Sequence, residues 1–120
     1  MNSPGVYTAS AAVTAAGTQV TSSITGLDGM LAASISLAFS YGSGGTTCDA
    51  FVQTSLDGGT VWQDVAHGAF TTASATKQFN VSGLTPKLTP ATPGDGTLAA
   101  DTAVDGVLGP MWRMKVVSVG

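Results

Sequence analysis

The stretch that most constrains the fold of this chain is residues 47–66, TCDAFVQTSLDGGTVWQDVA, which contains two extended segments joined by a turn. Before the turn, side chains alternate with a period of two, which places neighbours on opposite faces of a β-strand. Asp57, Gly58 and Gly59 tolerate a positive φ, and the Asp57 carboxylate can accept hydrogen bonds from the amides that follow it. The sequence therefore predicts a β-hairpin whose turn consists of these three residues and Ser55.

The composition of the chain argues against helices. Charged residues make up only 9% of the sequence, against about 25% in an ordinary soluble domain, and all seven acidic residues are Asp. Glu, Lys and Arg, which usually cover exposed helices, are therefore nearly missing. Turn residues recur at intervals of about 8 to 12 residues, as in antiparallel β folds. We expect one all-β domain, an antiparallel β-sandwich or a jelly-roll-like barrel of about six to eight short strands.

Alternating side chains also predict where the other strands lie. The clearest pattern covers residues 30–41, where mostly large apolar residues occupy one face and Ala or Ser the other. Such a small outer face suits a sheet that a neighbouring subunit or an arm covers. His67 and Gly68 are expected to end the second strand of the hairpin. Further strands are predicted at residues 19–24, 69–72, 76–81 and 107–119.

Two segments outside this pattern are candidates for contacts with a partner. Residues 1–17 are small, polar and rich in Ala without a helical period, which predicts an extended N-terminal arm ahead of one domain at residues 18–120. Residues 83–106 carry three prolines and four glycines, which predicts a long loop, and loops of this length usually make contacts. The candidate contact residues are Val6 and Tyr7 in the arm, and Pro86, Pro90, Pro93 and Asp95 in the loop.

Charge and hydropathy exclude two classes of partner. The net charge is −3, and four basic residues are too few to follow a phosphate backbone, so we expect no nucleic-acid binding. No apolar run is long enough to span a bilayer, and the N-terminus lacks the basic and continuous apolar regions of a signal peptide. We therefore expect that the protein is made in a cytoplasm and does not associate with a membrane. Whether the chain naturally ends at Gly120 is left open.

No catalytic site or cofactor is predicted. A glycosidase needs two carboxylates that converge across a cleft, and the spacing of the aspartates along the hairpin does not provide that. His67 has no partner at a zinc-ligand spacing, and Cys48 is expected to be a buried, unreactive thiol. Nucleophile-elbow and phosphate-binding glycine motifs are missing, so we expect no enzyme activity. The aspartates of the hairpin are Asp49, Asp57 and Asp64. Calcium binding at Asp95, Asp101 and Asp105 stays an alternative, although their spacing is not that of an EF-hand.

The turn SLDGGTVW, residues 55–62, resembles the Asp-box of sialidases and related propellers, S-x-D-x-G-x-T-W, with Val61 where that family usually has Thr. In that family the box is a structural hairpin that lies away from the active site. The resemblance implies that Ser55 and Asp57 hold the turn and that Trp62 packs beneath it. Because the box occurs once in a chain too short for a propeller, it implies no sialidase activity.

A larger part of the chain resembles small structural proteins encoded in the head-gene regions of tailed bacteriophages and prophages. The residues that carry this resemblance are 39–46, 52–59, 69–74 and 105–109. It implies a head decoration or cement protein of the virion, assembled in the cytoplasm of the host bacterium. Its partners would be the major capsid protein and other copies of itself, as a dimer or trimer.

Two alternatives to capsid decoration are kept. One is a head-to-tail or tail structural protein, since the sequence does not distinguish head from tail. The other is a carbohydrate-binding β-sandwich module for host attachment, which would need the flat face of Trp62 or Trp112 to be exposed. The alternation around Trp112 places it with core residues instead.

Overall fold

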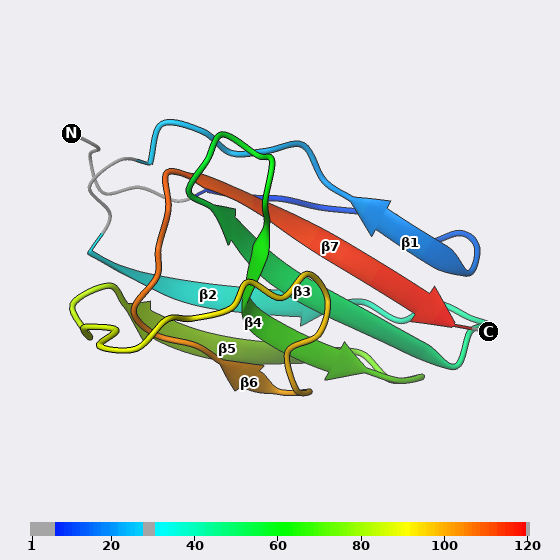
Figure 1. Cartoon of the computed structure of the whole chain (residues 1–120). Helices are drawn as coiled ribbons and strands as arrows, with labels where there is room; N and C mark the ends of the chain where they lie inside the picture. The colour runs from blue at the N-terminus through cyan, green and yellow to red at the C-terminus, as the bar shows by residue number, and fades with distance from the viewer. Residues whose placement is uncertain (1–6, 28–30, 120) are drawn as a thin grey trace.

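A computed structural model describes residues 7–27 and 31–119 of the chain. These residues form seven β-strands and no helix (Figure 1). The strands are β1 (Gly17–Val20), β2 (Ala32–Phe39), β3 (Thr47–Ser55), β4 (Gln63–Phe70), β5 (Ala75–Ser82), β6 (Thr102–Ala103) and β7 (Met111–Val119). The predicted all-β fold and the predicted number of strands are confirmed. Within the described residues no helix could span a bilayer.

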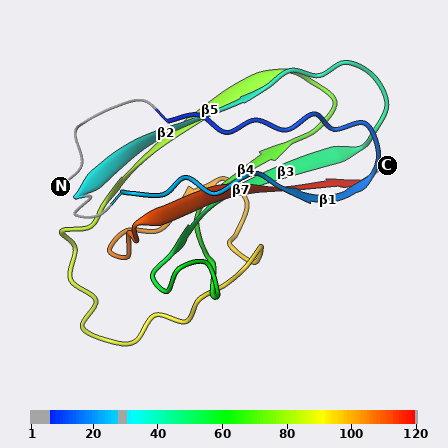
Figure 2. The same cartoon turned by 90° about the horizontal axis from the view of Figure 1, so that it is seen from above.

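The strands form two antiparallel sheets that face each other, as Figure 2 shows from above. The larger sheet has the order β1-β7-β3-β4-β6, and the smaller one consists of β2 and β5. None of the described strands is shared between the sheets, so they form a sandwich and not a closed barrel. β3 lies at the centre of the larger sheet, where it pairs with β4 on one side and β7 on the other. The predicted hairpin therefore forms the middle of the molecule.

The hydrophobic core fills the space between the two sheets in two clusters. One contains Leu37, Cys48, Ala50, Phe70 and Val116, and the other contains Leu27, Val65, Val81 and Trp112. Phe39 of β2 stacks on Phe70 of β4 with ring centroids 5.2 Å apart, which joins the sheets directly. The free thiol of Cys48 is buried, as expected, and burial followed by the negative charge of Asp49 raises its pKa.

The prediction that His67 and Gly68 end a strand is wrong, because β4 runs through both residues to Phe70. Gly68 faces the smaller sheet, where a Cβ would lie 2.8 Å from the Leu37 side chain, so the glycine makes room for β2. His67 points to the opposite face and is buried. The strand predicted at residues 69–72 is therefore only the end of β4.

Other boundaries also differ from the predictions. The strand predicted at residues 19–24 is shorter, since β1 ends at Val20 and Ile24 makes only an isolated bridge to Trp112. The strand predicted at residues 107–119 begins at Met111, and β6 lies inside the predicted loop. In residues 30–41 the alternation of buried and exposed side chains is as predicted from Ala32 onward, and Met30 lies outside the described residues.

Residues 7–16, the described part of the N-terminal segment, form no strand. Residues 7–16 are all exposed, and they run along the opening between the two sheets before the chain turns back into β1 (Figures 1 and 2). Gly17, the last residue of the predicted arm, has φ of 139° and is the first residue of β1. Val6, a candidate contact residue, lies outside the described residues.

Candidate interaction surface

The turn of the central hairpin is held by side-chain hydrogen bonds within residues 55–61. The buried Ser55 hydroxyl donates to Asp57 Oδ1 at 2.9 Å and accepts the Gly59 amide at 2.9 Å. The same carboxylate oxygen accepts the Thr60 amide at 3.1 Å and the Val61 amide at 2.9 Å. The Val61 amide, followed by the Ser55 hydroxyl, lowers the pKa of Asp57. All of the acceptor capacity of Asp57 oxygen Oδ1 is thus used inside the turn.

Both tryptophans are buried and use their polar atoms internally. The exposed fractions of Trp62 and Trp112 are 8% and 6%. Their indole nitrogens donate to the carbonyls of Gly59 and Gly109, each at 2.9 Å. The Arg113 guanidinium covers the ring of Trp62 at 4.3 Å from its centroid. Neither ring therefore presents a flat face to a sugar.

A polar network ties the second half of the long loop to the outer face of the larger sheet. Asp64 of β4 accepts hydrogen bonds from the amides of residues 96–98 at 2.7 to 3.0 Å. Gln53 of β3, which is fully buried, donates to Asp64 at 2.9 Å and to Asp95 at 2.7 Å. Its carbonyl oxygen accepts from Arg113 Nε at 2.8 Å, and Lys115 binds Asp95 at 2.9 Å. The loop is thereby fixed at this point.

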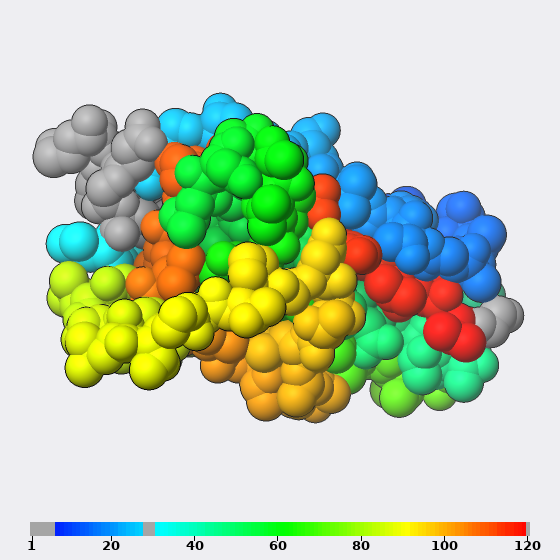
Figure 3. Space-filling view, in the orientation of Figure 1, coloured from blue at the N-terminus to red at the C-terminus, as the bar shows by residue number. Residues whose placement is uncertain are grey.

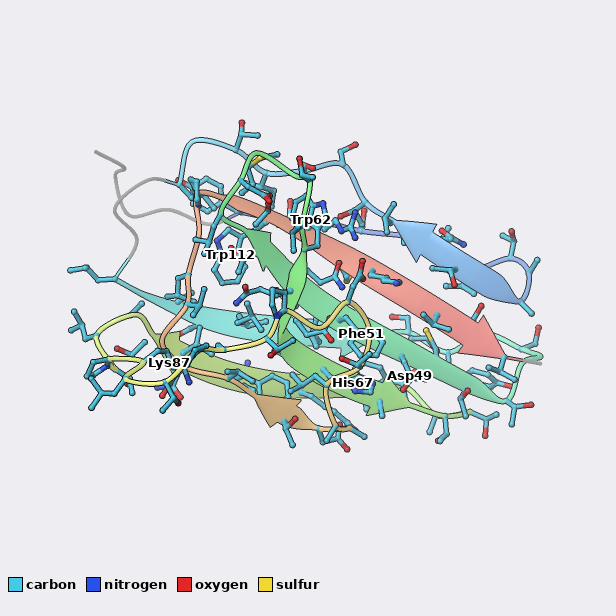
Figure 4. All side chains as sticks on the ribbon, in the orientation of Figure 1. Asp49, Phe51, Trp62, His67, Lys87 and Trp112 are labelled. Atoms are coloured by element: carbon cyan, nitrogen blue, oxygen red, sulfur yellow. The ribbon has the colours of Figure 1, made fainter. Side chains whose placement is uncertain are left out.

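A second contact holds the same loop a few residues further on. The ring of His67 stacks on Phe51 at a centroid distance of 4.0 Å, next to Asp49 (Figure 4). Its Nε2 lies 2.9 Å from Asp49 Oδ1 and its Nδ1 lies 2.8 Å from the carbonyl oxygen of Leu98. A carbonyl oxygen only accepts, so Nδ1 carries the hydrogen of that contact. With both ring nitrogens occupied, His67 has no free nitrogen with which to activate a serine.

The three loop aspartates considered as a calcium site are not grouped together. Asp95 binds Lys115 and Arg113, whereas Asp101 pairs with Lys77 at 2.7 Å and Asp105 accepts the amide of Ser82. Among the described residues, no three His, Cys, Asp or Glu side chains are grouped as a metal site would require. The candidate contact residue Asp95 is half-exposed, but its carboxylate oxygens are engaged within the molecule.

The first half of the loop is exposed and carries apolar side chains. Pro86, Pro90 and Pro93 are exposed, and the exposed fractions of Leu84 and Leu88 reach 70% and 91%. Leu31, 62% exposed, lies beside the start of this loop because its carbonyl accepts the Gly83 amide at 2.7 Å. In Figure 3 the loop forms the surface at one end of the molecule. We call residues 84–93 together with Leu31 the end patch.

A cavity of about 690 Å³ lies at the opening of the sandwich, under the N-terminal segment. The end of β2, the start of β3 and the end of β7 line it on the inside, and residues 9–16 lie over it. Apolar side chains from the core reach it, among them Leu37, Phe39, Phe70 and Met114. Tyr7, the remaining candidate contact residue, is 50% exposed. Along this side residues 9–16 therefore cover the core.

The network around Gln53 and Asp64 was not predicted as a functional element. A signal for it exists in the sequence, because a polar residue stands at the turn-proximal end of each hairpin strand, where the strands pair. The sequence does not reveal which distant residues satisfy these groups, since the loop amides come from residues 96–98. No protein-family model, curated protein or solved structure matches this chain.

Proposed function

We propose that this chain is a non-enzymatic structural protein of a bacteriophage virion, a decoration protein that binds the capsid and associates with other copies of itself. The observation that carries the proposal is the end patch, where leucines and prolines are exposed on a loop that is anchored at its far end. Large apolar side chains in this position are typical of a protein contact. Because the far end of the loop is already anchored, the loop loses less conformational entropy when it binds a partner.

The small number of charged residues agrees with this role. Ser, Thr, Ala and Gly cover most of the exposed positions, and only eleven residues of 120 are acidic or basic. A capsid-bound subunit must bury roughly 800 Å² of its surface per contact, and burying few charges lowers the desolvation cost. Lys87 is the one charged residue between Leu84 and Gly94 in the sequence, so an acidic group on the capsid would suit this loop.

Binding of purified protein to capsids tests the proposal. The double substitution Leu84→Ser with Leu88→Ser should abolish or strongly weaken binding to capsids while the melting temperature stays unchanged, because both side chains are exposed. Leu56→Ser is the matched control, since Leu56 is likewise exposed, at 62%, but lies on the hairpin turn. Equal binding by the unsubstituted protein, the double variant and Leu56→Ser would contradict a role for the end patch.

The copy number in purified virions distinguishes the head and tail alternatives. A decoration protein should be present at a number of copies comparable to that of the major capsid protein. A few copies per particle would favour a head-to-tail or tail protein.

The carbohydrate-binding alternative receives no support from the tryptophans. Both indoles are buried, so acrylamide should quench their fluorescence much less than that of free tryptophan. Efficient quenching of either indole would return this alternative to consideration.

A further inference from the structure

One edge of β2 is free in the part of the chain that the structure describes. β2 pairs with β5 along eight consecutive residues without a register shift, and no described strand pairs with its other edge. The smaller sheet therefore has two strands opposite a sheet of five. The cavity of about 690 Å³ lies along this free edge, where a third strand would cover the core residues of β3 and β7.

The free edge lacks the features that usually prevent strands from pairing. β2 contains no charged residue, no proline and no bulge. The carbonyl of Leu31 points toward β5, because it accepts the amide of Gly83. Since successive residues direct their backbone groups to opposite edges, the N–H and C=O groups of the even-numbered residues point to the free edge. These residues are Ala32, Ser34, Ser36 and Ala38, and their small side chains are exposed.

The N-terminal segment has the properties of a strand for this edge but does not fill that place in its own molecule. Residues 7–16 are uncharged and about as long as β2, and small side chains predominate. They run in the same direction as β2 in both views (Figures 1 and 2), whereas every ladder between the described strands is antiparallel. Their carbonyls at Ala12 and Ala15 accept only side-chain hydrogen bonds, from Gln19 and Ser118.

We infer that residues 7–16 of a second copy of this chain pair with the free edge of β2 as an antiparallel third strand. The positive φ of Gly17, 139°, marks the point at which the segment can swing away from its own molecule. Reciprocal exchange between two copies forms a closed twofold dimer in which both edges are covered. The absence of charge on both strands means that no ion is desolvated in the new ladder.

The inference rests on the proposed function only for self-association and does not need the capsid. A dimer that forms by exchange but does not bind capsids would remove the proposed capsid role alone. Capsid binding by a chain that stays monomeric would remove the exchange alone.

Sedimentation velocity and amide hydrogen exchange, from about 1 μM to about 1 mM full-length protein, test the inference. We expect a concentration-dependent dimer, in which the amides of Ser34 and Ser36 become protected as the dimer forms. The amides of Ile35 and Leu37 point toward β5 and should be protected at every concentration. A protein that is monomeric throughout, or equally fast exchange at Ser34 and Ser36 at all concentrations, would overturn the inference.

Substitutions identify the two partners of the ladder. Ser36→Pro removes a donor from the free edge without removing one from the β2–β5 ladder, and it should weaken dimerisation by about tenfold or more. Ser36→Thr keeps the donor and is the matched control. Ala11→Pro with Ala12→Pro should weaken dimerisation to a similar extent, because it removes adjacent donors from the exchanged segment. A dimer that is sensitive to Ser36→Pro but insensitive to the double substitution would show that another segment occupies the edge, which overturns the exchange.

Discussion

Single hydroxyl and carboxylate groups decide how the central hairpin turns. Ser55 is fully buried, and its hydroxyl links the Gly59 amide to the Asp57 carboxylate. Ser55→Ala should lower the free energy of unfolding by about 1–2 kcal/mol, because the part-buried Gly59 amide loses its acceptor. Urea unfolding measures this, with Ser43→Ala at an exposed loop position as the control. Equal losses in the two variants would mean that the Ser55 hydroxyl is not specifically required.

Stability in acid is also decided at single residues. The Val61 amide lowers the pKa of Asp57, and Lys77 lowers the pKa of Asp101. Burial acts to raise the pKa of Asp95, but the hydrogen bonds from Gln53 and Lys115 outweigh it, so this pKa is lowered as well. A carboxyl whose pKa is lower in the folded state stabilises the fold above its unfolded pKa of about 3.9, and this stabilisation is lost as the pH falls through the folded value. Urea unfolding should therefore show a stability that declines below about pH 4. Asp57→Asn should make the decline shallower, and an identical decline in both proteins would contradict this role of Asp57.

At the scale of elements, one carboxylate connects the long loop to the sheet. Asp64 accepts three backbone amides of the loop and the Gln53 side chain. Asp64→Asn places a donor against these donors and should lower the free energy of unfolding by about 2–4 kcal/mol. Hydrogen exchange should accelerate at the amides of residues 96–98.

The control for this loop prediction is Asp105→Asn. Asp105 is exposed and accepts the Ser82 amide, so its substitution should cost about 1 kcal/mol or less. Unchanged exchange at residues 96–98 in Asp64→Asn would mean that the loop is held by other contacts.

At the scale of the whole molecule, stability depends on how closely the two sheets approach. Gly68 of β4 faces Leu37 of β2, and a Cβ there would lie 2.8 Å from Leu37 Cδ1 and 3.2 Å from Phe70. Gly68→Ala should therefore destabilise the protein by about 1–3 kcal/mol, measured by thermal or urea unfolding. Gly42→Ala is the control, since no atom lies within 4 Å of its added Cβ, and it should change stability by about 0.5 kcal/mol or less. A Gly68→Ala protein as stable as the control would show that Leu37 and Phe70 can shift to admit the methyl group at no cost.

Local chemistry in the sequence determined the all-β class, the central hairpin and its turn. The alternation in β2, the shortage of helix-forming charged residues and the Ser55–Asp57 turn all act between residues that are near in sequence. For the same reason the continuation of the second hairpin strand through His67 was missed, because Gly68 breaks a local pattern but fits a packing requirement set by Leu37 of the other sheet.

The tertiary structure alone decided which surfaces are occupied and which are free. The loop expected to make contacts divides into an anchored half and the exposed end patch. The anchored half is held because Gln53 and Asp64 form hydrogen bonds with loop residues more than thirty positions away in the sequence. The free edge of β2 likewise follows from the pairing of β2 with β5, which lie on either side of the central hairpin in the sequence. Long-range pairing satisfies backbone groups that no local pattern can assign, and so it determines where this molecule can receive another chain.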